Sequence, residues 1–448
     1  MEKRIGKNEL NLLSQKSRTK YYRGFQALPV RLKFVLGMRK YLWHRKVFPL
    51  FILNPFKGGA IKTLAVMRKL QLRKIVKFNK HYYLSLTVPR WPSEAFDRMV
   101  ALGGLNVTAA GTRYKTQIDI AILAITSKCD FKCKHCYEHF NLNAKDRVSI
   151  QRWKEVIREI QKIGVNIIAL SGGEPLLSYE GLLEILDSGN KSLSEFHLYT
   201  SGHSFTLLKA RELKKAGLSA VAVGLDDVNP ERNDSLRGFK GAYNEAIKAI
   251  GHSKKAGLFT YINTCLTKKI VLSEDLWKFF DMAKEMNVGA IRLLEPKPCG
   301  GYLRENPDIL FSEKERQKVT DLFEAINQKK KYRDYPLVAY EDYVESPERL
   351  GCMMGGHTHL HVDSKGHVEP CVFLPISFGN ILEEDFATIY RRMRTLIPRP
   401  VHRLCPSIYL SKKIRGFHDH GMPLPIPFSN VQKEWSELFD EDPSNAPL

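Results

Sequence analysis

Three cysteines, Cys129, Cys133 and Cys136, lie within one eight-residue stretch in the pattern C-x3-C-x2-C. Three thiolates on a short loop can hold three irons of a [4Fe–4S] cluster and leave the fourth iron open to bind another molecule. A zinc ion is the alternative, because His135 or His139 would supply the fourth ligand of a tetrahedral site. The spacing alone leaves both kinds of site open.

The chain around this loop alternates between short apolar segments and amphipathic ones. Strands are predicted over 118–126, 166–173, 196–202, 219–226, 259–267 and 290–296, and helices over 148–163, 179–188, 204–216, 241–256 and 274–286. Strands that alternate with helices pair in parallel through right-handed crossovers. The fold class is therefore predicted to be α/β, a partial (β/α)6 TIM-like barrel whose chemistry lies at the carboxyl ends of the strands.

Polar and glycine-rich motifs follow several of these strand ends. The motifs are Ser171-Gly172-Gly173-Glu174-Pro175, Tyr199-Thr200-Ser201-Gly202, Leu225-Asp226, the run Asn233 to Gly238 that includes Arg237, and Asn263. Glycines allow close backbone approach, and Glu174 is expected to pair with an ammonium group. Asp226 and Asn263 have the alternative role of capping helices or turns.

The cysteine loop, followed directly by Tyr137 and then by the GGE motif, resembles the radical S-adenosylmethionine (SAM) superfamily. The resemblance implies that Cys129, Cys133 and Cys136 bind a [4Fe–4S] cluster whose open iron chelates SAM. It also implies reductive cleavage to a 5′-deoxyadenosyl radical, which abstracts hydrogen from a substrate, and a reducing electron donor such as flavodoxin or ferredoxin. The implied SAM-binding residues are Tyr137 at the adenine, Gly172, Gly173 and Glu174 at the methionine end, and Ser201, Asp226, Arg237 and Asn263.

Two positions depart from the pattern of the peptide-modifying branch, S-L-D-G followed by H-D-x-x-R-G. Gly224 stands where that branch has serine, and Asn233 where it has histidine. The change at Gly224 removes a hydroxyl expected near the ribose or carboxylate of SAM, which puts that contact in doubt.

A second group of cysteines, Cys352-x13-Gly366-x4-Cys371 with Cys405 downstream, resembles the start of a SPASM or twitch extension, which carries auxiliary Fe–S clusters. Gly366 is predicted to lie in a hairpin turn. The dense C-x2-C-x5-C-x3-C of a full SPASM domain is absent, so one auxiliary cluster is expected, with Cys299 as the candidate fourth ligand. The alternative is that these are ordinary cysteines.

Two other features remain outside these motifs. His357, His359 and His361 alternate, so they are either a metal site on one strand face or, as we favour, polar packing. Cys265 is predicted to be a packing residue rather than a ligand.

The N-terminal region is strongly basic. Residues 1–80 hold 21 Lys or Arg but only two acidic residues, and so account for most of the +22 charge of the 448-residue chain. The segment 61–78 has apolar residues at helical spacing with basic residues on another face. We therefore expect a basic helical region that binds an anionic membrane surface, with nucleic acid as a weaker candidate and a merely solvated surface as the alternative.

These observations divide the chain into a basic, mainly helical region (1–117), a radical SAM core (118–300), a helical connector (301–350), an auxiliary-cluster domain (351–410) and a loosely ordered tail (411–448). The SPASM-like segment favours a peptide or protein substrate, and the basic N-terminus favours a lipid or membrane-held one. A zinc-binding, nucleic-acid-associated protein is the alternative of another class. With no secretion signal in residues 1–24 and no apolar run of spanning length, the expected location is the cytoplasm, in part at the inner face of the membrane.

Overall fold

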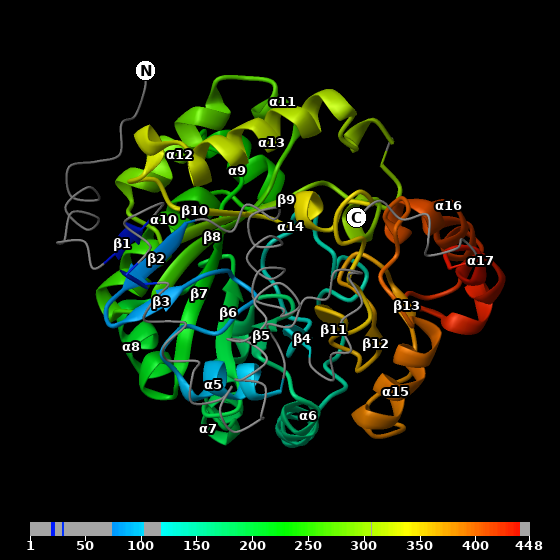
Figure 1. Ribbon diagram of the computed structural model, residues 1–448. Helices are drawn as coiled ribbons and strands as arrows, with labels where there is room; N and C mark the ends of the chain where they lie inside the picture. Colours follow the sequence, from blue (N-terminus) through cyan, green and yellow to red (C-terminus); the bar gives the residue numbers. More distant parts are fainter. Residues whose placement is uncertain (1–18, 23–28, 31–73, 103–117, 306, 440–448) are drawn as a thin grey trace, which may run out of the picture.

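The computed structural model describes residues 19–22, 29–30, 74–102, 118–305 and 307–439. Within them, one curved sheet has nine strands in the order β10-β9-β8-β7-β6-β5-β4-β11-β12. The predicted six strands are confirmed as β4 (Ile120–Ala124), β5 (Ile167–Ser171), β6 (Glu195–Thr200), β7 (Leu218–Gly224), β8 (Phe259–Cys265) and β9 (Ala290–Leu294), all paired in parallel. The sheet forms a partial barrel (Figure 1).

Helices cover the outer face of this sheet. They are α6 (Ile150–Ile163), α7 (Tyr179–Ser188), α8 (Leu207–Lys215), α10 (Ala242–Ala256), α12 (Asp275–Glu285) and α13 (Glu313–Gln328), with the shorter α9 (Pro230–Arg237) and α11 (Lys268–Val271) beside them. α6 shows why they form where predicted. The Ser149 side chain caps its first turn, Gly164 ends it at φ 117°, and its apolar face, which includes Trp153 and Ile157, is buried.

The sheet extends beyond the predicted strands at both edges. β10 (Leu337–Tyr340) pairs in parallel with β9, and β11 (His359–Val362) pairs in parallel with β4. β12 (Val368–Glu369) returns antiparallel to β11 through a turn in which Gly366 has φ 93°, so the predicted hairpin is confirmed. The C-terminal cysteine region therefore shares its sheet with the barrel.

The described part of the N-terminal region corrects a prediction. Residues 75–78 were expected to end a helix, but they form β2 (Ile75–Phe78), which pairs with β1 (Thr19–Tyr22) and β3 (His81–Tyr83). Successive strand residues face opposite sides, and Ile75 and Val76 are both buried in separate apolar clusters, so packing on both faces of β2 overrides the helical spacing. Residues 31–73, with the rest of the expected helix, lie outside the described residues.

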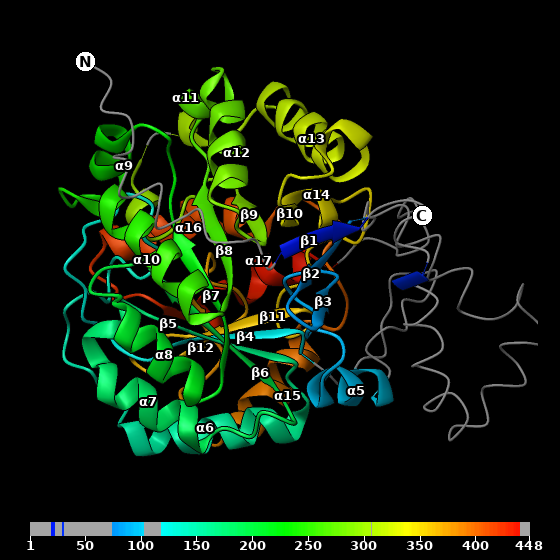
Figure 2. The same cartoon turned by 90° about the vertical axis from the view of Figure 1, so that its left-hand side faces the viewer.

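This small sheet, with α5 (Glu94–Ala101) following it, lies on the side of the barrel away from the outer helices (Figure 2). Val76 and Tyr83 pack against Phe259 and Tyr261 of β8 and against alanines of β7. The buried Lys74 donates hydrogen bonds to the carbonyls of Ile326, Tyr332, Tyr335 and Pro336, so α13 and the segment after it also hold the region in place.

The C-terminal residues were predicted to be a loosely ordered tail, and up to residue 439 this is wrong. α15 (Phe386–Leu396) and α16 (Pro406–Asp419) are followed by β14 (Ile426–Pro427) and α17 (Gln432–Glu437). Trp435 is buried, packs against Phe378 and Phe428, and donates a hydrogen bond to the Leu396 carbonyl. Buried apolar side chains such as Trp435, which lie between the prolines, hold this segment in place.

Among the described helices, none has the length and apolarity to cross a membrane.

Candidate active site

The predicted cluster loop directly follows β4, at the carboxyl edge of the barrel. The three loop cysteines line a cavity, open to solvent, that also reaches Cys265 and Cys299. Of the other predicted SAM-binding residues, Tyr137, Gly172, Gly173, Ser201, Asp226, Arg237 and Asn263 line this same cavity, whereas Glu174 does not.

Backbone hydrogen bonds from neighbouring segments fix the loop. The amide of Glu174 donates to the Lys128 carbonyl (2.7 Å), and the amide of Gly301 donates to the Cys136 carbonyl (2.9 Å). On a third side, the amide of Lys134 donates to the Leu236 carbonyl at the end of α9 (2.9 Å). The loop is therefore held from β5, from α9 and from the segment after β9.

Glycines make these approaches possible. A Cβ atom at Gly173 would lie 2.2 Å from the Lys128 carbonyl oxygen, and one at Gly300 would lie 2.1 Å from that of Cys136. Gly300 also has φ 51°, which side chains rarely adopt. The glycines of the GGE motif were predicted to admit a ligand, and the structure adds that they admit the cluster loop itself. The role of Gly300 was missed, because Cys299-Gly300-Gly301 matched no motif.

Glu174 joins two strand ends rather than facing the cavity. Its buried carboxylate accepts hydrogen bonds from the Thr200 hydroxyl (2.8 Å), the Ser201 hydroxyl (2.6 Å), the Ser201 amide (2.8 Å) and the Leu176 amide (3.2 Å). A carboxylate has about four positions that accept hydrogen bonds, and these four bonds occupy all of them. The contact of Glu174 with an ammonium group stays a prediction.

Two predicted residues, Asp226 and Arg237, form a buried ion pair. Arg237 Nε lies 2.6 Å from Asp226 Oδ2, and the amide of Cys265 donates to Asp226 Oδ1 (2.8 Å). Despite burial, the Arg237 charge holds the pKa of Asp226 below its usual range. A Cβ at Gly224 would lie 2.3 Å from Arg237 Nη1. The guanidinium thus occupies the space that a side chain at position 224 would need in this chain.

Cavity groups without partners show that the site suits a polar ligand. Asn263 Oδ1 is buried and has no hydrogen-bond partner among the described residues, and the same holds for His135 Nδ1. Tyr137 is oriented by a hydrogen bond between its hydroxyl and that of Ser171 (2.6 Å). Unpaired buried polar atoms are costly, so the three loop thiols together with these groups fit a [4Fe–4S] cluster with bound SAM.

The cysteines of the predicted auxiliary site come together from four segments. Cys299 follows β9, Cys352 follows α14 (Glu341–Val344), Cys371 follows β12, and Cys405 caps α16. Burial raises the pKa of Cys299, Cys352 and Cys371, and in each case the nearby Cys405 raises it further. The thiols of Cys299, Cys352 and Cys371 thus each lie close enough to Cys405 to feel its charge, and four such thiols are a donor set that suits an Fe–S cluster.

The three alternating histidines do not gather around one point. His357 lies by the Ile397 carbonyl (3.1 Å) and His359 by Glu345 (3.6 Å). His361 lies between Glu138 (3.2 Å) and Glu369 (3.3 Å), so it joins the cluster loop to the β11–β12 hairpin, and the two carboxylates raise its pKa to about 10 despite burial. Polar packing, the interpretation favoured from the sequence, agrees with these contacts.

The zinc and Fe–S alternatives differ in how they space their ligands. A structural zinc site brings its ligands to about 2.0–2.3 Å from one ion, whereas an Fe–S cube spaces its thiolates more widely, since each binds a different iron. The relatives of the chain decide between the two.

Comparison with family models agrees with this site. The model of the radical SAM superfamily matches residues 123–283, and that of the SPASM iron–sulfur cluster-binding domain matches residues 352–407. The chain thus carries a radical SAM domain and a SPASM domain. This radical SAM protein is accordingly an enzyme that uses a [4Fe–4S] cluster and SAM, with auxiliary Fe–S binding in its SPASM domain.

Curated relatives of this radical SAM enzyme have different products. The AdoMet-dependent heme synthase of Methanosarcina barkeri is 28% identical over 295 residues, which are 60% of this chain and 83% of the relative. The subtilosin biosynthesis protein AlbA of Bacillus subtilis is 26% identical over 336 residues, or 72% and 68%. The fold is similar to that of Streptococcus suis SuiB bound to the precursor peptide SuiA, with a TM-score of 0.51, 18% identity, and 62% of this chain and 65% of SuiB covered.

Proposed function

We propose that this enzyme acts on a side chain of a peptide or protein. The carrying observation is the cavity, which runs from the cluster loop to Cys299 and Phe373 at the SPASM domain. This cavity must hold both the cluster and SAM, and it opens to solvent. A side chain of a peptide is a substrate group that can enter such an open cavity while the rest of the substrate stays outside.

The cofactors, when bound, supply a 5′-deoxyadenosyl radical that abstracts a hydrogen atom from the substrate. The chain holds the cluster through Cys129, Cys133 and Cys136, and the Gly172–Gly173 backbone with Ser201 and Asn263 binds SAM. The auxiliary cysteines, through Cys299, border the far end of the same cavity. An external low-potential donor, such as flavodoxin or ferredoxin, supplies the electron.

The relatives support a peptide substrate unequally. SuiB was solved with a precursor peptide, and AlbA takes part in the biosynthesis of a bacteriocin, whereas the heme synthase indicates a porphyrin. Residues 1–80, the basis for a lipid substrate and membrane binding, lie mostly outside the described residues. Membrane association and the cytoplasmic location stay predictions.

Deuterium transfer tests the proposal. The reconstituted enzyme, with SAM and dithionite, is incubated in parallel with pooled peptides bearing deuterated side chains, with deuterated iron coproporphyrin, and with vesicles of deuterated anionic phospholipid. We expect deuterium in 5′-deoxyadenosine from the peptides alone, measured by mass spectrometry. Transfer only from the porphyrin or only from the lipid would overturn the peptide proposal. A C129A/C133A/C136A enzyme is the matched control and should transfer none.

A further inference from the structure

His361 bridges two segments that carry cluster cysteines. Its Nε2 lies 3.2 Å from Glu138 Oε1, and its Nδ1 lies 3.3 Å from Glu369 Oε2. Glu138 comes two residues after Cys136, and Glu369 comes two residues before Cys371. All three side chains of the bridge are buried. The β11–β12 hairpin of the SPASM domain is therefore connected, through one imidazole ring, to the segment that follows the radical-cluster loop.

The same hairpin holds this segment at two further points. The Ser364 hydroxyl donates a hydrogen bond to Glu138 Oε2 (3.3 Å). The side-chain amide of Asn141 donates to that oxygen (3.0 Å) and also to Asp363 Oδ2 in the hairpin (3.3 Å). The residues after Cys136 are thus positioned by the SPASM hairpin as well as by the barrel.

Tyr137 lies between this bridge and the cavity. It lines the cavity and also a smaller pocket, which it shares with His361, Glu138 and Glu369. The rings of Tyr137 and His361 meet edge to face, with centroids 5.5 Å apart and planes at 89°, an arrangement that aromatic pairs prefer. The hydrogen bond between the hydroxyls of Tyr137 and Ser171 (2.6 Å) fixes the far end of the tyrosine. The place of the Tyr137 ring therefore depends on β5 and on the SPASM hairpin together.

We propose that His361 is a positioning residue for SAM, which holds the Tyr137 ring in place so that the SPASM hairpin completes the SAM site. The inference rests on the predicted contact of Tyr137 with SAM and does not depend on the identity of the substrate. A ring that is fixed before the ligand arrives loses less conformational freedom on binding. Loss of the imidazole removes one of the two restraints on this ring and should weaken SAM binding.

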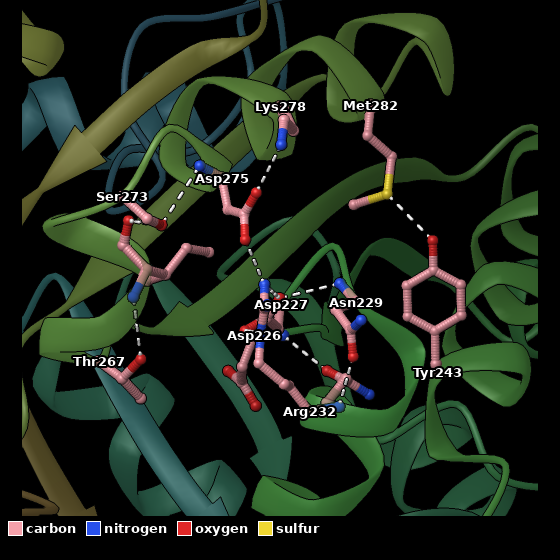
Figure 3. A network of polar contacts seen from close by, with 12 residues as sticks. Asp226, Asp227, Asn229, Arg232, Tyr243, Thr267, Ser273, Asp275, Lys278 and Met282 are labelled. Atoms are coloured by element: carbon pink, nitrogen blue, oxygen red, sulfur yellow. Dashed lines mark hydrogen bonds and ion pairs between the residues drawn. The ribbon is translucent and has the colours of Figure 1, made fainter. Parts of the chain in front are cut away.

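Arg232 is a comparable bridge outside the site. Its Nη2 lies 2.6 Å from Asp227 Oδ1 and 2.6 Å from Asp275 Oδ2, so it ties α9 to α12, as Figure 3 shows. Arg232 is not among the described residues that line the cavity. R232Q therefore removes a cation held by two carboxylates without altering a contact of Tyr137, which makes it a matched control.

The test is equilibrium dialysis of labelled SAM against the reconstituted full-length enzyme, without reductant, so that no SAM is cleaved. We expect H361Q to raise the dissociation constant of SAM at least fivefold, and Y137L to raise it as well. Because His361 acts through Tyr137, H361Q should raise it less than twofold in a Y137L background. R232Q should leave it unchanged, as should H359Q, which alters the histidine two residues away on β11.

The double variant separates positioning from a general structural role. A general loosening of the site would add to the effect of Y137L instead of vanishing in its presence. Iron content and circular dichroism establish that each variant is loaded and folded. If H361Q is not loaded, E369Q removes one of the two charged partners of His361 and is expected to weaken SAM binding by a smaller factor. Unchanged SAM affinity in loaded H361Q, Y137L or E369Q, or independent effects of H361Q and Y137L, would overturn the proposal.

Discussion

The two cysteine sites of this enzyme are built in opposite ways. The radical-cluster thiols come from one loop of eight residues, Cys129 to Cys136, and neighbouring segments fix that loop through its backbone. The auxiliary thiols come from four segments between Cys299 and Cys405. The first site is a property of local spacing, whereas the second exists only once the sheet and α16 are in place. The two should therefore respond differently to the same kinds of change.

The largest expected effect separates the two sites chemically. C129A/C133A/C136A should abolish formation of 5′-deoxyadenosine from SAM, because it removes all three predicted thiolate ligands of the radical cluster. The variant should retain the irons of the auxiliary site. Product analysis by liquid chromatography and iron determination measure the two outcomes. Native-level 5′-deoxyadenosine would contradict the assignment, and a folded variant devoid of iron would contradict an auxiliary cluster.

The reciprocal variant, C352A/C371A/C405A, should lose the auxiliary irons but still cleave SAM with the substrate absent. Iron content and 5′-deoxyadenosine formation again report on each site. C299A then decides the fourth ligand, since loss of the auxiliary cluster in C299A supports ligation by Cys299. C265A is the matched control, because Cys265 lines the cavity but is predicted to be a packing residue rather than a ligand. Loss of iron in C265A would mean that the ligands are wrongly assigned.

A methyl group added against the cluster loop should disturb the radical-cluster site. G300A places a Cβ 2.1 Å from the Cys136 carbonyl oxygen, and we expect it to lower the free energy of unfolding by about 1–3 kcal/mol and to reduce radical-cluster loading. In G416A the added Cβ meets nothing within 4 Å. That variant should gain about 0.5–1 kcal/mol, because Gly416 lies inside α16. Denaturant titration with iron analysis compares them, and equal effects would contradict the packing argument.

Low pH should lower the free energy of unfolding through the buried His357, which lies in the SPASM domain. Burial lowers the pKa of His357 to about 3, so the folded state favours the neutral ring. Its contribution to stability is full above pH 6.5 and is lost as the pH falls towards 3. One pH unit below the unfolded-state pKa costs about 1.4 kcal/mol. The free energy of unfolding of the wild type should therefore fall by about 2 kcal/mol relative to that of H357Q between pH 7.5 and 5. Denaturant titrations across this range measure the difference, and a constant difference would contradict the assignment.

Sequence patterns were sufficient where the determinants are local. Six strands, the cysteine loop and the hairpin at Gly366 all follow from spacing and turn chemistry, and all appear as predicted. Non-local packing decided the rest. The strand at Ile75 depends on the inner face of β8, the order of the last segment depends on the burial of Trp435, and the place of Glu174 depends on the hydroxyls of β6. The close approach of the Arg237 guanidinium to Gly224 became visible only in the folded structure.

The pairing of β11 with β4 has a consequence for biosynthesis. β4 ends at Ala124, but its partner β11 ends only at Val362. At a synthesis rate of about 5–20 residues per second, the interval between them is about 10–50 s. Throughout that time the nascent barrel presents β4 as an unpaired apolar edge, which is a template for aggregation. Ribosome-bound chains that stop before residue 359 should therefore bind chaperones, and longer ones should release them.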